Sequence, residues 1–266
     1  MKTKKYLVVG NPINHSLSPE LHNYWLKENN INAIYDKIKL EDNEIKNFIN
    51  DIKSQKIAGC NVTVPFKKKV IQFMDRLSLE ADLTQSVNTI TFDNGNLIGH
   101  NTDIAGFDRA IKSLNLVMKG KKIFILGAGG VVPSIILALK KMDVLEITVS
   151  NRTRKNAENL KAHFKDLKIL KWGELIDFDV IINATSLGLN NEFINLDFSK
   201  AGKNKLFYDV IYNPSQTNFL KEGKRLGNKI ENGKLMFIYQ AFEAFKLWHK
   251  IEPEINNNSL KILDND

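Results

Sequence analysis

The sequence predicts an α/β protein in which an N-terminal α/β domain precedes a Rossmann-type domain with a parallel sheet. Segments with strand character alternate with helical segments along nearly the whole chain, which is the pattern of a largely parallel sheet. The alternation pauses at residues 115–120 and starts again at Lys121. A strand-like run then leads through Gly127-Ala-Gly129 into a helical segment, as in nucleotide-binding βαβ units.

The first series of elements begins with a buried strand at residues 5–9, which Gly10-Asn-Pro12 ends. Ser18 and Pro19 then predict the start of a helix, with Ser18 as N-cap and Pro19 at the first helical position. The next predicted segments are a strand at 33–38, a helix at 43–52 and a strand that ends at 61–64 before Pro65.

A β-hairpin is predicted next, because strand-like residues 88–92 and 96–100 flank Asp93-Asn-Gly95. Asn-Gly accepts the positive φ angles of a two-residue turn. Thr102 follows as the expected N-cap of a helix at 103–114.

The second series has strands near 121–126, 145–150, 179–183 and 205–210, and helices near 132–142, 154–164 and 215–226. A final helix at 235–249 carries aromatic residues at helical spacing, which indicates core packing. A short helix is expected in the tail after Pro253. These segments predict one domain from residues 1–102, completed by 235–266, and a second from 103–234.

Composition excludes several classes of protein. With 266 residues, 43% hydrophobic and 26% charged, the chain is typical of a globular protein with two modest domains. The net charge of +8 comes from scattered lysines without interleaved aromatic residues, so it favours anionic ligands rather than nucleic acid. Cys60 is the only cysteine, so neither a disulfide framework nor a thiolate zinc site is expected.

No apolar run approaches the ~18 residues of a membrane span, and the N-terminus lacks the apolar region of a signal peptide. We therefore expect a cytoplasmic protein without membrane partners. No cluster of histidines and carboxylates has metal-ligand spacing, so we expect no metal.

The glycines after Leu126 predict a dinucleotide-binding turn. Gly127 would make the tight turn, Gly129 would let the backbone approach a pyrophosphate, and Gly130 would help to bare N–H groups at the helix N-terminus. In the strict fingerprint the third glycine would fall at Val132.

The end of the next strand predicts which nicotinamide cofactor binds. An NAD enzyme normally has a carboxylate there for the ribose 2′-hydroxyl, whereas this chain has Ser150-Asn-Arg-Thr-Arg-Lys155. A guanidinium at Arg152 suits a 2′-phosphate, so NADP is favoured. Arg154 and Lys155 remain alternative contacts.

Two other segments place a charged group after small, hydroxyl and amide side chains: Gly59-Cys-Asn-Val-Thr-Val-Pro-Phe-Lys67 and Asn101-Thr-Asp103. Such a pattern indicates a site for a polyhydroxylated small molecule. Together with Ser16-Leu-Ser18, Gly127-Ala-Gly-Gly130 and Asn151-Arg-Thr153, the chain resembles the shikimate dehydrogenase family. The resemblance extends to Asn183-Ala-Thr-Ser-Leu-Gly188, Asp209-Val-Ile-Tyr-Asn-Pro214 and the region of Gly233 and Gln240.

The resemblance implies NADPH-dependent, reversible reduction of 3-dehydroshikimate to shikimate, in the pathway to chorismate and the aromatic amino acids. It implies a monomer or homodimer with the active site in a cleft between the domains. The implied substrate-binding residues are Ser16, Ser18, Thr63, Lys67, Asn88, Asp103, Tyr212 and Gln240. The implied cofactor-binding residues are Gly127, Ala128, Gly129, Gly130, Val131, Asn151, Arg152, Thr153, Arg154, Thr185, Ser186, Val210 and Gly233.

The chain departs from the family pattern at three places. Asn156 stands where many members have a further arginine, Val131-Val-Pro133 replaces smaller residues, and His249-Lys250 replaces a commoner Thr-Gly pair.

The resemblance also implies that Lys67 and Asp103 are catalytic, with Lys67 as proton donor and Asp103 as its partner. A nearby carboxylate favours the protonated form of a lysine, which suits an acid. Transfer by Lys67 itself and a relay through a substrate hydroxyl or water both remain open.

Two rival hypotheses remain: a quinate/shikimate paralogue with relaxed choice of substrate and cofactor, and a non-catalytic NADP-binding regulator. The short-chain dehydrogenases are excluded, because no Tyr-x-x-x-Lys pair follows the nucleotide motif.

Overall fold

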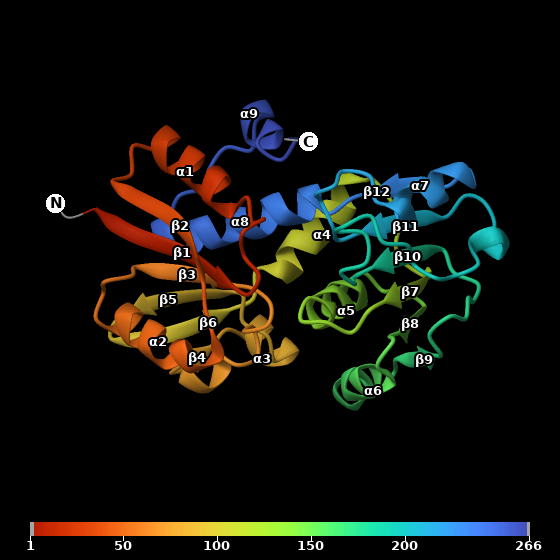
Figure 1. Ribbon diagram of the computed structural model, residues 1–266, viewed down its shortest axis with the longest axis horizontal. Coiled ribbons are helices and arrows are strands. Elements are labelled where there is room, and N and C mark those ends of the chain that lie inside the picture. The colour runs from red at the N-terminus through yellow and green to blue at the C-terminus, as the bar shows by residue number, and fades with distance from the viewer. Residues whose placement is uncertain (1–2, 265–266) are drawn as a thin grey trace. The chain divides into compact units, whose positions relative to one another are not determined.

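Two six-stranded sheets organise residues 3–264, which are the residues that the computed structural model describes (Figure 1). The chain divides into two units, each built around one sheet. Unit 1 takes the chain up to Gly106 and again from Ile238, and unit 2 runs over Phe107–Phe237. The predicted α/β class is confirmed. The functional division at residues 102/103 and 234/235 stays a prediction.

The sheet of unit 1 is mixed. Its strands are β1 (Lys4–Gly10), β2 (Ala33–Lys39), β3 (Gly59–Val62), β4 (Arg76–Leu77), β5 (Thr89–Asp93) and β6 (Asn96–His100), in the order β2-β1-β3-β5-β6-β4. β1 pairs in parallel with β2 and β3, while β5 is antiparallel to β3 and β6. The β5–β6 hairpin turns through Asn94 and Gly95, whose φ angles of 49° and 80° confirm the predicted turn chemistry.

The helical segments of unit 1 are α1 (Ser18–Glu28), η1 (Asp42–Glu44), α2 (Ile45–Lys53), η2 (Ile71–Phe73), α3 (Leu79–Thr84), α8 (Lys234–His249, from Ile238) and α9 (Asn257–Lys261). Successive side chains of a strand point to opposite faces. Leu7 and Val9 therefore join α2 in one apolar core, whereas Tyr6, on the other face, contacts Trp248 of α8 with ring centroids 5.0 Å apart. Gly59 lies beneath that tryptophan, since a Cβ there would come within 2.5 Å of Trp248 Nε1.

The start of α1 corrects a sequence-based prediction. Ser18 was expected as N-cap, but the helix includes Ser18, and Leu17 occupies the cap position without a side-chain hydrogen bond. The Ser18 hydroxyl instead accepts from the Ser16 hydroxyl at 3.2 Å. The helix amides therefore do not use this hydroxyl.

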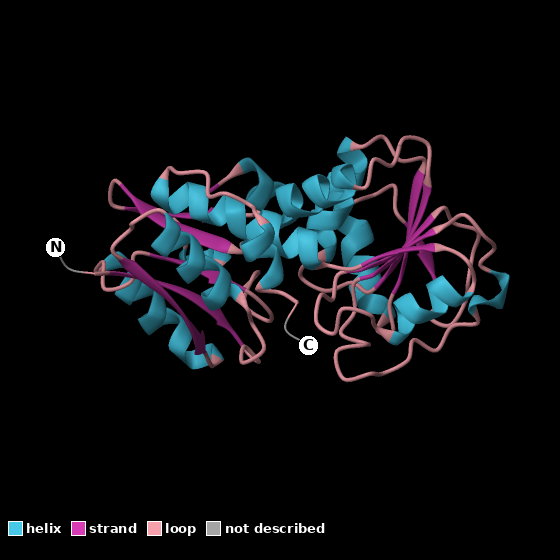
Figure 2. Cartoon of the chain, turned by 90° about the horizontal axis from the view of Figure 1, so that it is seen from above, coloured by secondary structure: helices cyan, strands magenta, loops and turns pink. Residues whose placement is uncertain are grey.

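The sheet of unit 2 is entirely parallel, and Figure 2 shows its strands fanned by twist. Its strands are β7 (Lys122–Leu126), β8 (Glu146–Ser150), β9 (Lys168–Leu170), β10 (Val180–Asn183), β11 (Leu206–Asp209) and β12 (Lys229–Glu231), in the order β12-β11-β10-β7-β8-β9. This is the doubly wound order of a dinucleotide-binding fold. The strand order, not the strand direction, reverses between β7 and β10. The two outer strands, β9 and β12, escaped prediction because three residues are too few to show a period.

The helices of unit 2 lie where the sequence predicts them: α4 (Asp103–Ser113, from Phe107), α5 (Val132–Lys141), α6 (Arg154–His163) and α7 (Asn218–Arg225). The connection from β10 to β11 contains one short 3₁₀ helix, η3 (Phe198–Lys200), and no α-helix. Within residues 3–264 no helix is long and apolar enough to cross a membrane. The expected compartment stays a prediction.

Candidate functional site

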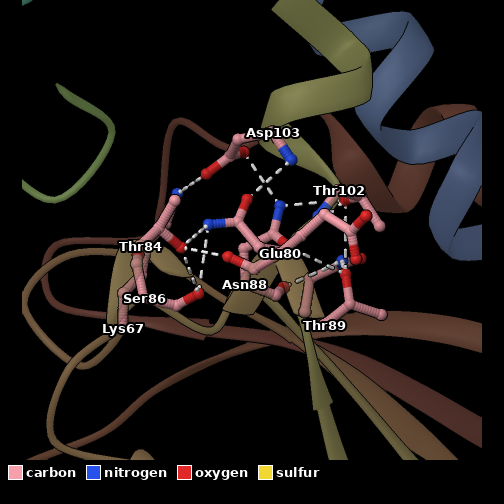
Figure 3. A network of polar contacts seen from close by, with 10 residues as sticks. Lys67, Glu80, Thr84, Ser86, Asn88, Thr89, Thr102 and Asp103 are labelled. Atoms are coloured by element: carbon pink, nitrogen blue, oxygen red, sulfur yellow. Dashed lines mark hydrogen bonds and ion pairs between the residues drawn. The ribbon is translucent and has the colours of Figure 1, made fainter. Parts of the chain in front are cut away.

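A buried ion pair marks the candidate site of unit 1. Lys67 Nζ lies 2.5 Å from Asp103 Oδ2, and the two side chains are only 10% and 7% exposed (Figure 3). Lys67 lies in the turn after β3, and Asp103 is the first residue of α4. Burying two charges costs several kcal/mol per ion before their attraction is counted. A pair retained at that cost is a candidate for chemistry.

Asn88 holds the Asp103 carboxylate from the other side. Its Oδ1 accepts from the backbone N–H of Thr102 at 2.8 Å, and a backbone N–H can only donate. This fixes the orientation of the amide, so Nδ2 donates to Asp103 Oδ1 at 2.8 Å. Each carboxylate oxygen of Asp103 therefore has its own donor, and Figure 3 shows both.

The segment Asn101–Asp103 is held by side-chain hydrogen bonds. Asn101 Oδ1 accepts from the Asp103 amide at 3.1 Å, while Asn101 Nδ2 donates to Thr84 Oγ1 at 2.9 Å. Thr102 precedes the helix as predicted, but its hydroxyl lies against Asn88 and Thr89. The cap of α4 is thus contributed by Asn101, and the threonine expected as N-cap is part of the buried polar cluster.

The other predicted substrate residues of unit 1 lie on separate elements. Ser16 and Ser18 are joined by an Oγ–Oγ contact of 3.2 Å at the start of α1. Thr63 is half-buried just after β3, and its backbone N–H bonds to Val9. Gln240 lies half-buried on α8. All four of these residues remain predicted ligands.

Tyr212, the remaining predicted substrate residue, belongs to unit 2. It follows β11, and its ring packs on Phe237 with centroids 4.5 Å apart.

The predicted phosphate turn of unit 2 joins β7 to α5. Gly127 has a φ of +112°, and a Cβ there would come within 2.7 Å of the Ala184 carbonyl oxygen, so only glycine fits. A Cβ at Gly129 would meet no described heavy atom within 4 Å. The first glycine is thus required by the fold, whereas the second leaves open space beside the turn.

The N-terminus of α5 is suited to an anion. Its cap position, Val131, makes no side-chain hydrogen bond, and its first turn contains no acidic residue. A helix N-terminus carries partial positive charge on N–H groups that lack helical partners, and a phosphate can satisfy them. Ala128 and Gly130 lie in the same turn.

The basic segment after β8 is exposed. Arg154 pairs with Glu158 at 2.9 Å on the same helix, whereas Arg152 forms no ion pair with any residue that the structure describes. Asn151 Nδ2 bonds to the carbonyl of Thr153, which sets the turn that presents Arg152. Arg152 is therefore the better candidate for a 2′-phosphate contact.

The loops after β10 and β11 are joined by the buried carboxylate of Asp209, which begins one of the family-like segments but had no role assigned from the sequence. Asp209 Oδ2 accepts from the Thr217 hydroxyl at 2.6 Å, Asp209 Oδ1 accepts from the Ile211 N–H at 3.0 Å, and Asn183 Nδ2 donates to both oxygens. Burial raises the pKa of Asp209 to about 6, although the hydrogen bonds from Thr217, Ile211 and Asn183 oppose that shift. An acidic residue at the end of an apolar strand was the available signal.

The hydrogen bonds of Asp209 with Asn183, Thr217 and Ile211, here called the Asp209 clamp, order several of the predicted cofactor residues. Asn183 Oδ1 accepts from the hydroxyl of Thr185 at 2.7 Å, while Ser186, the next residue, is exposed. Val210 follows Asp209 and meets Gly233 closely, because a Cβ at Gly233 would come within 2.0 Å of the Val210 carbonyl oxygen. Gly233 is thus required for packing, and any cofactor contact there would involve its backbone.

The residues present fit nicotinamide adenine dinucleotide phosphate (NADP). Open space lies beside Gly129, an uncapped helix start follows it, and Arg152 is a cation without an ion pair among residues 3–264. In the described part of the chain, no group of three or more His, Cys, Asp or Glu side chains could hold a metal ion.

Comparison with known proteins gives two family matches. Residues 8–90 match the model described as the shikimate dehydrogenase substrate binding domain, and residues 109–209 match the model described as shikimate / quinate 5-dehydrogenase.

Individual relatives agree over almost the full length. A protein from Pelagibacter ubique named shikimate dehydrogenase (NADP(+)) is 55% identical over 262 residues, covering 98% of this chain and 99% of that protein. The crystal structure of shikimate dehydrogenase from Aquifex aeolicus superimposes with a TM-score of 0.91 at 34% identity, covering 99% of this chain and 98% of that one. The Thermus thermophilus shikimate 5-dehydrogenase, solved in complex with NADP(H) and shikimate, gives a TM-score of 0.89 at 28% identity, covering 98% of each chain.

Proposed function

Because the chain belongs to the shikimate dehydrogenase family, we propose that it catalyses the reversible, NADPH-dependent reduction of 3-dehydroshikimate to shikimate. The observation that carries the proposal is the buried pair of Lys67 and Asp103, held at 2.5 Å in the unit that matches the substrate-binding model. A non-catalytic regulator would have no need for a buried charge pair.

In the proposed reaction, NADPH when bound supplies the hydride that reduces the C3 carbonyl. Lys67 donates a proton to the oxygen that gains negative charge, and the ammonium also stabilises that charge before transfer. Asp103 keeps Lys67 in place through its Oδ2 contact, and Asn88 keeps Asp103 in place. Among the described residues, only one of the three Nζ donors of Lys67 has an acceptor, so the others are available to the substrate.

We propose that the substrate carboxylate binds at Ser16 and Ser18, whose hydroxyls are neutral donors. Tyr212, on unit 2, is proposed to contact the same carboxylate. The ring hydroxyls would meet Thr63, Asn88 and Gln240 together with the ion pair.

The cofactor would bind to unit 2. The pyrophosphate would lie at the Gly127–Val131 turn, the 2′-phosphate at Arg152, and the nicotinamide half along the loops that contain Thr185, Ser186 and Val210. The relatives' names and the complex with NADP(H) support this assignment.

The test is an assay of NADP⁺ reduction, followed by the near-ultraviolet absorbance of the reduced nicotinamide, with shikimate or quinate and with NADP⁺ or NAD⁺. Turnover restricted to shikimate with NADP⁺ is expected. Comparable rates with quinate or NAD⁺ would favour the relaxed paralogue, a possibility raised by the shikimate / quinate family model. NADP⁺ binding without turnover of either substrate would refute the proposal.

A further inference from the structure

A chain of buried polar side chains leads from Tyr35 on β2 to the Asp103 carboxylate. Tyr35 and the next member of the chain, Asn61 on β3, do not belong to the predicted site. The Tyr35 hydroxyl donates to Asn61 Oδ1 at 2.6 Å. Asn61 Nδ2 donates to Thr89 Oγ1 at 3.0 Å, and Thr89 Oγ1 donates to Asn88 Oδ1 at 3.0 Å.

The donors and acceptors along this chain have one consistent direction. Asn88 Nδ2 must donate to Asp103, because its Oδ1 faces the backbone N–H of Thr102. Thr89 accepts from Asn61, so its single proton is directed to Asn88. Every step from Tyr35 to Asp103 is thus a donation toward the carboxylate.

Tyr35 is held in place as a donor. Burial raises the pKa of its phenol well above the ordinary value, so the hydroxyl keeps its proton. His22 of α1 stacks on the phenol ring with centroids 4.2 Å apart and planes 3° apart. Burial also lowers the pKa of His22 to about 3, with His249 adding to that shift, so no charge develops against the ring near neutral pH.

We propose that Tyr35 and Asn61 are positioning residues of the reaction: through Thr89 they fix the amide of Asn88, which in turn holds Asp103 against Lys67. The proposal rests on the function proposed above. Hydrogen bonds in one direction polarise one another, so each donor strengthens the next. The chain contains two amides, which do not shuttle protons, so it orients the acid–base pair and is not a proton wire.

Tyr35 and Asn61 are not among the proposed substrate ligands. Removing the Tyr35 hydroxyl should therefore leave substrate binding intact while it slows the chemical step.

The experiment compares Tyr35→Phe with the wild-type protein in the shikimate and NADP⁺ assay. The variant leaves Asn61 Oδ1 buried without its donor, and we expect kcat to fall roughly 10-fold. The KM values for shikimate and NADP⁺ should not rise. Tyr6→Phe is the matched control, because Tyr6 is the register partner of Tyr35 on β1 and its hydroxyl is not part of the chain. The control should keep the wild-type kcat.

A double-mutant cycle separates positioning from general loosening of the fold. If Tyr35 acts through Asn88, then Tyr35→Phe should change kcat by less than about twofold in an Asn88→Ala background. Thr89→Val, which removes the intervening hydroxyl at constant shape, should reproduce the loss of kcat if Tyr35→Phe does not fold.

An unchanged kcat in both Tyr35→Phe and Thr89→Val would overturn the proposal. So would an equal loss in Tyr6→Phe, or losses from Tyr35→Phe and Asn88→Ala that multiply. A wild-type protein without shikimate turnover would instead refute the proposed function, and that result is visible before any variant is made.

Discussion

Asp103 in unit 1 and Asp209 in unit 2 are both buried carboxylates, but their partners differ. Asp103 faces the Lys67 ammonium and one amide, whereas Asp209 faces only the neutral donors of Asn183, Thr217 and the Ile211 backbone among the described residues. The charged partner makes the first carboxylate part of the proposed acid–base pair. The second, with a pKa raised to about 6, joins two loops. The partners of a buried carboxylate therefore distinguish a residue proposed for catalysis from one that joins two loops.

The two units also prepare their sites in different ways. Unit 1 fixes Asp103 with side-chain hydrogen bonds from Asn88 and Asn101, and the proposed proton transfer requires such a defined geometry. Unit 2 presents backbone groups, glycines and exposed cations, which suit an anion that is recognised by charge. Four substitutions, each with a comparison variant, test this contrast.

The largest effect is expected at the acid–base pair. Lys67→Ala should lower kcat by about 10²–10⁴-fold, because the proton donor is lost. KM for NADP⁺ should change little. Lys68→Ala is the control, since the neighbouring lysine is exposed. A Lys67→Ala enzyme with near-normal kcat would contradict the assignment, and thermal unfolding should accompany the assay because Asp103 is left buried without its cation.

The Asp209 clamp should affect stability in a pH-dependent way. Its pKa of about 6 in the folded protein exceeds the ordinary value of about 3.9, so the folded state keeps a proton that the unfolded chain has already released. Stability from this group is therefore present at acid pH and is lost as pH rises through 6. Relative to Asp209→Asn, the wild-type free energy of unfolding should fall by up to about 3 kcal/mol between about pH 4 and pH 7.

Denaturant titrations at both pH values measure this difference. Asp177→Asn serves as a control of opposite sign, because Lys122 lowers the pKa of that exposed carboxyl. An equal slope for the wild type and Asp209→Asn would contradict the raised pKa.

At the cofactor site, Arg152→Ala should raise KM for NADP⁺ by roughly 10- to 100-fold through loss of charge-assisted hydrogen bonds, with NAD⁺ unaffected. Arg154→Ala should have the smaller effect, since Glu158 already pairs with it. The reverse ranking, obtained from initial rates at varied cofactor concentration, would move the 2′-phosphate contact to Arg154.

The smallest effect separates the roles of two glycines. Gly129→Ala should leave the melting temperature unchanged, since its Cβ meets no protein atom within 4 Å, yet weaken NADP⁺ binding about 10-fold if the pyrophosphate lies there. Gly127→Ala should lower the melting temperature, because its φ is +112°. Unchanged NADP⁺ affinity in Gly129→Ala, measured by calorimetry, would place the pyrophosphate elsewhere.

The sequence by itself determined the order of the principal strands and helices, the hairpin at Asn94-Gly95 and the phosphate turn. All of these depend on local signals: apolar periodicity, turn chemistry and glycine spacing. It also identified Lys67 and Asp103 through the family resemblance, and the structure brings their side chains within 2.5 Å.

Only the tertiary structure decided which polar side chains support that pair. Tyr35, Asn61, Thr89 and Asn88 are far apart in sequence and become neighbours because β2, β3 and β5 share one sheet. Likewise Ser18 and Thr102 read as N-caps locally, yet the Ser18 hydroxyl accepts from Ser16 and the Thr102 hydroxyl accepts from Asn88. Local patterns report what a residue can do with its neighbours in the chain, whereas hydrogen bonds in a core depend on the order of the strands in the sheet and on which face each side chain occupies.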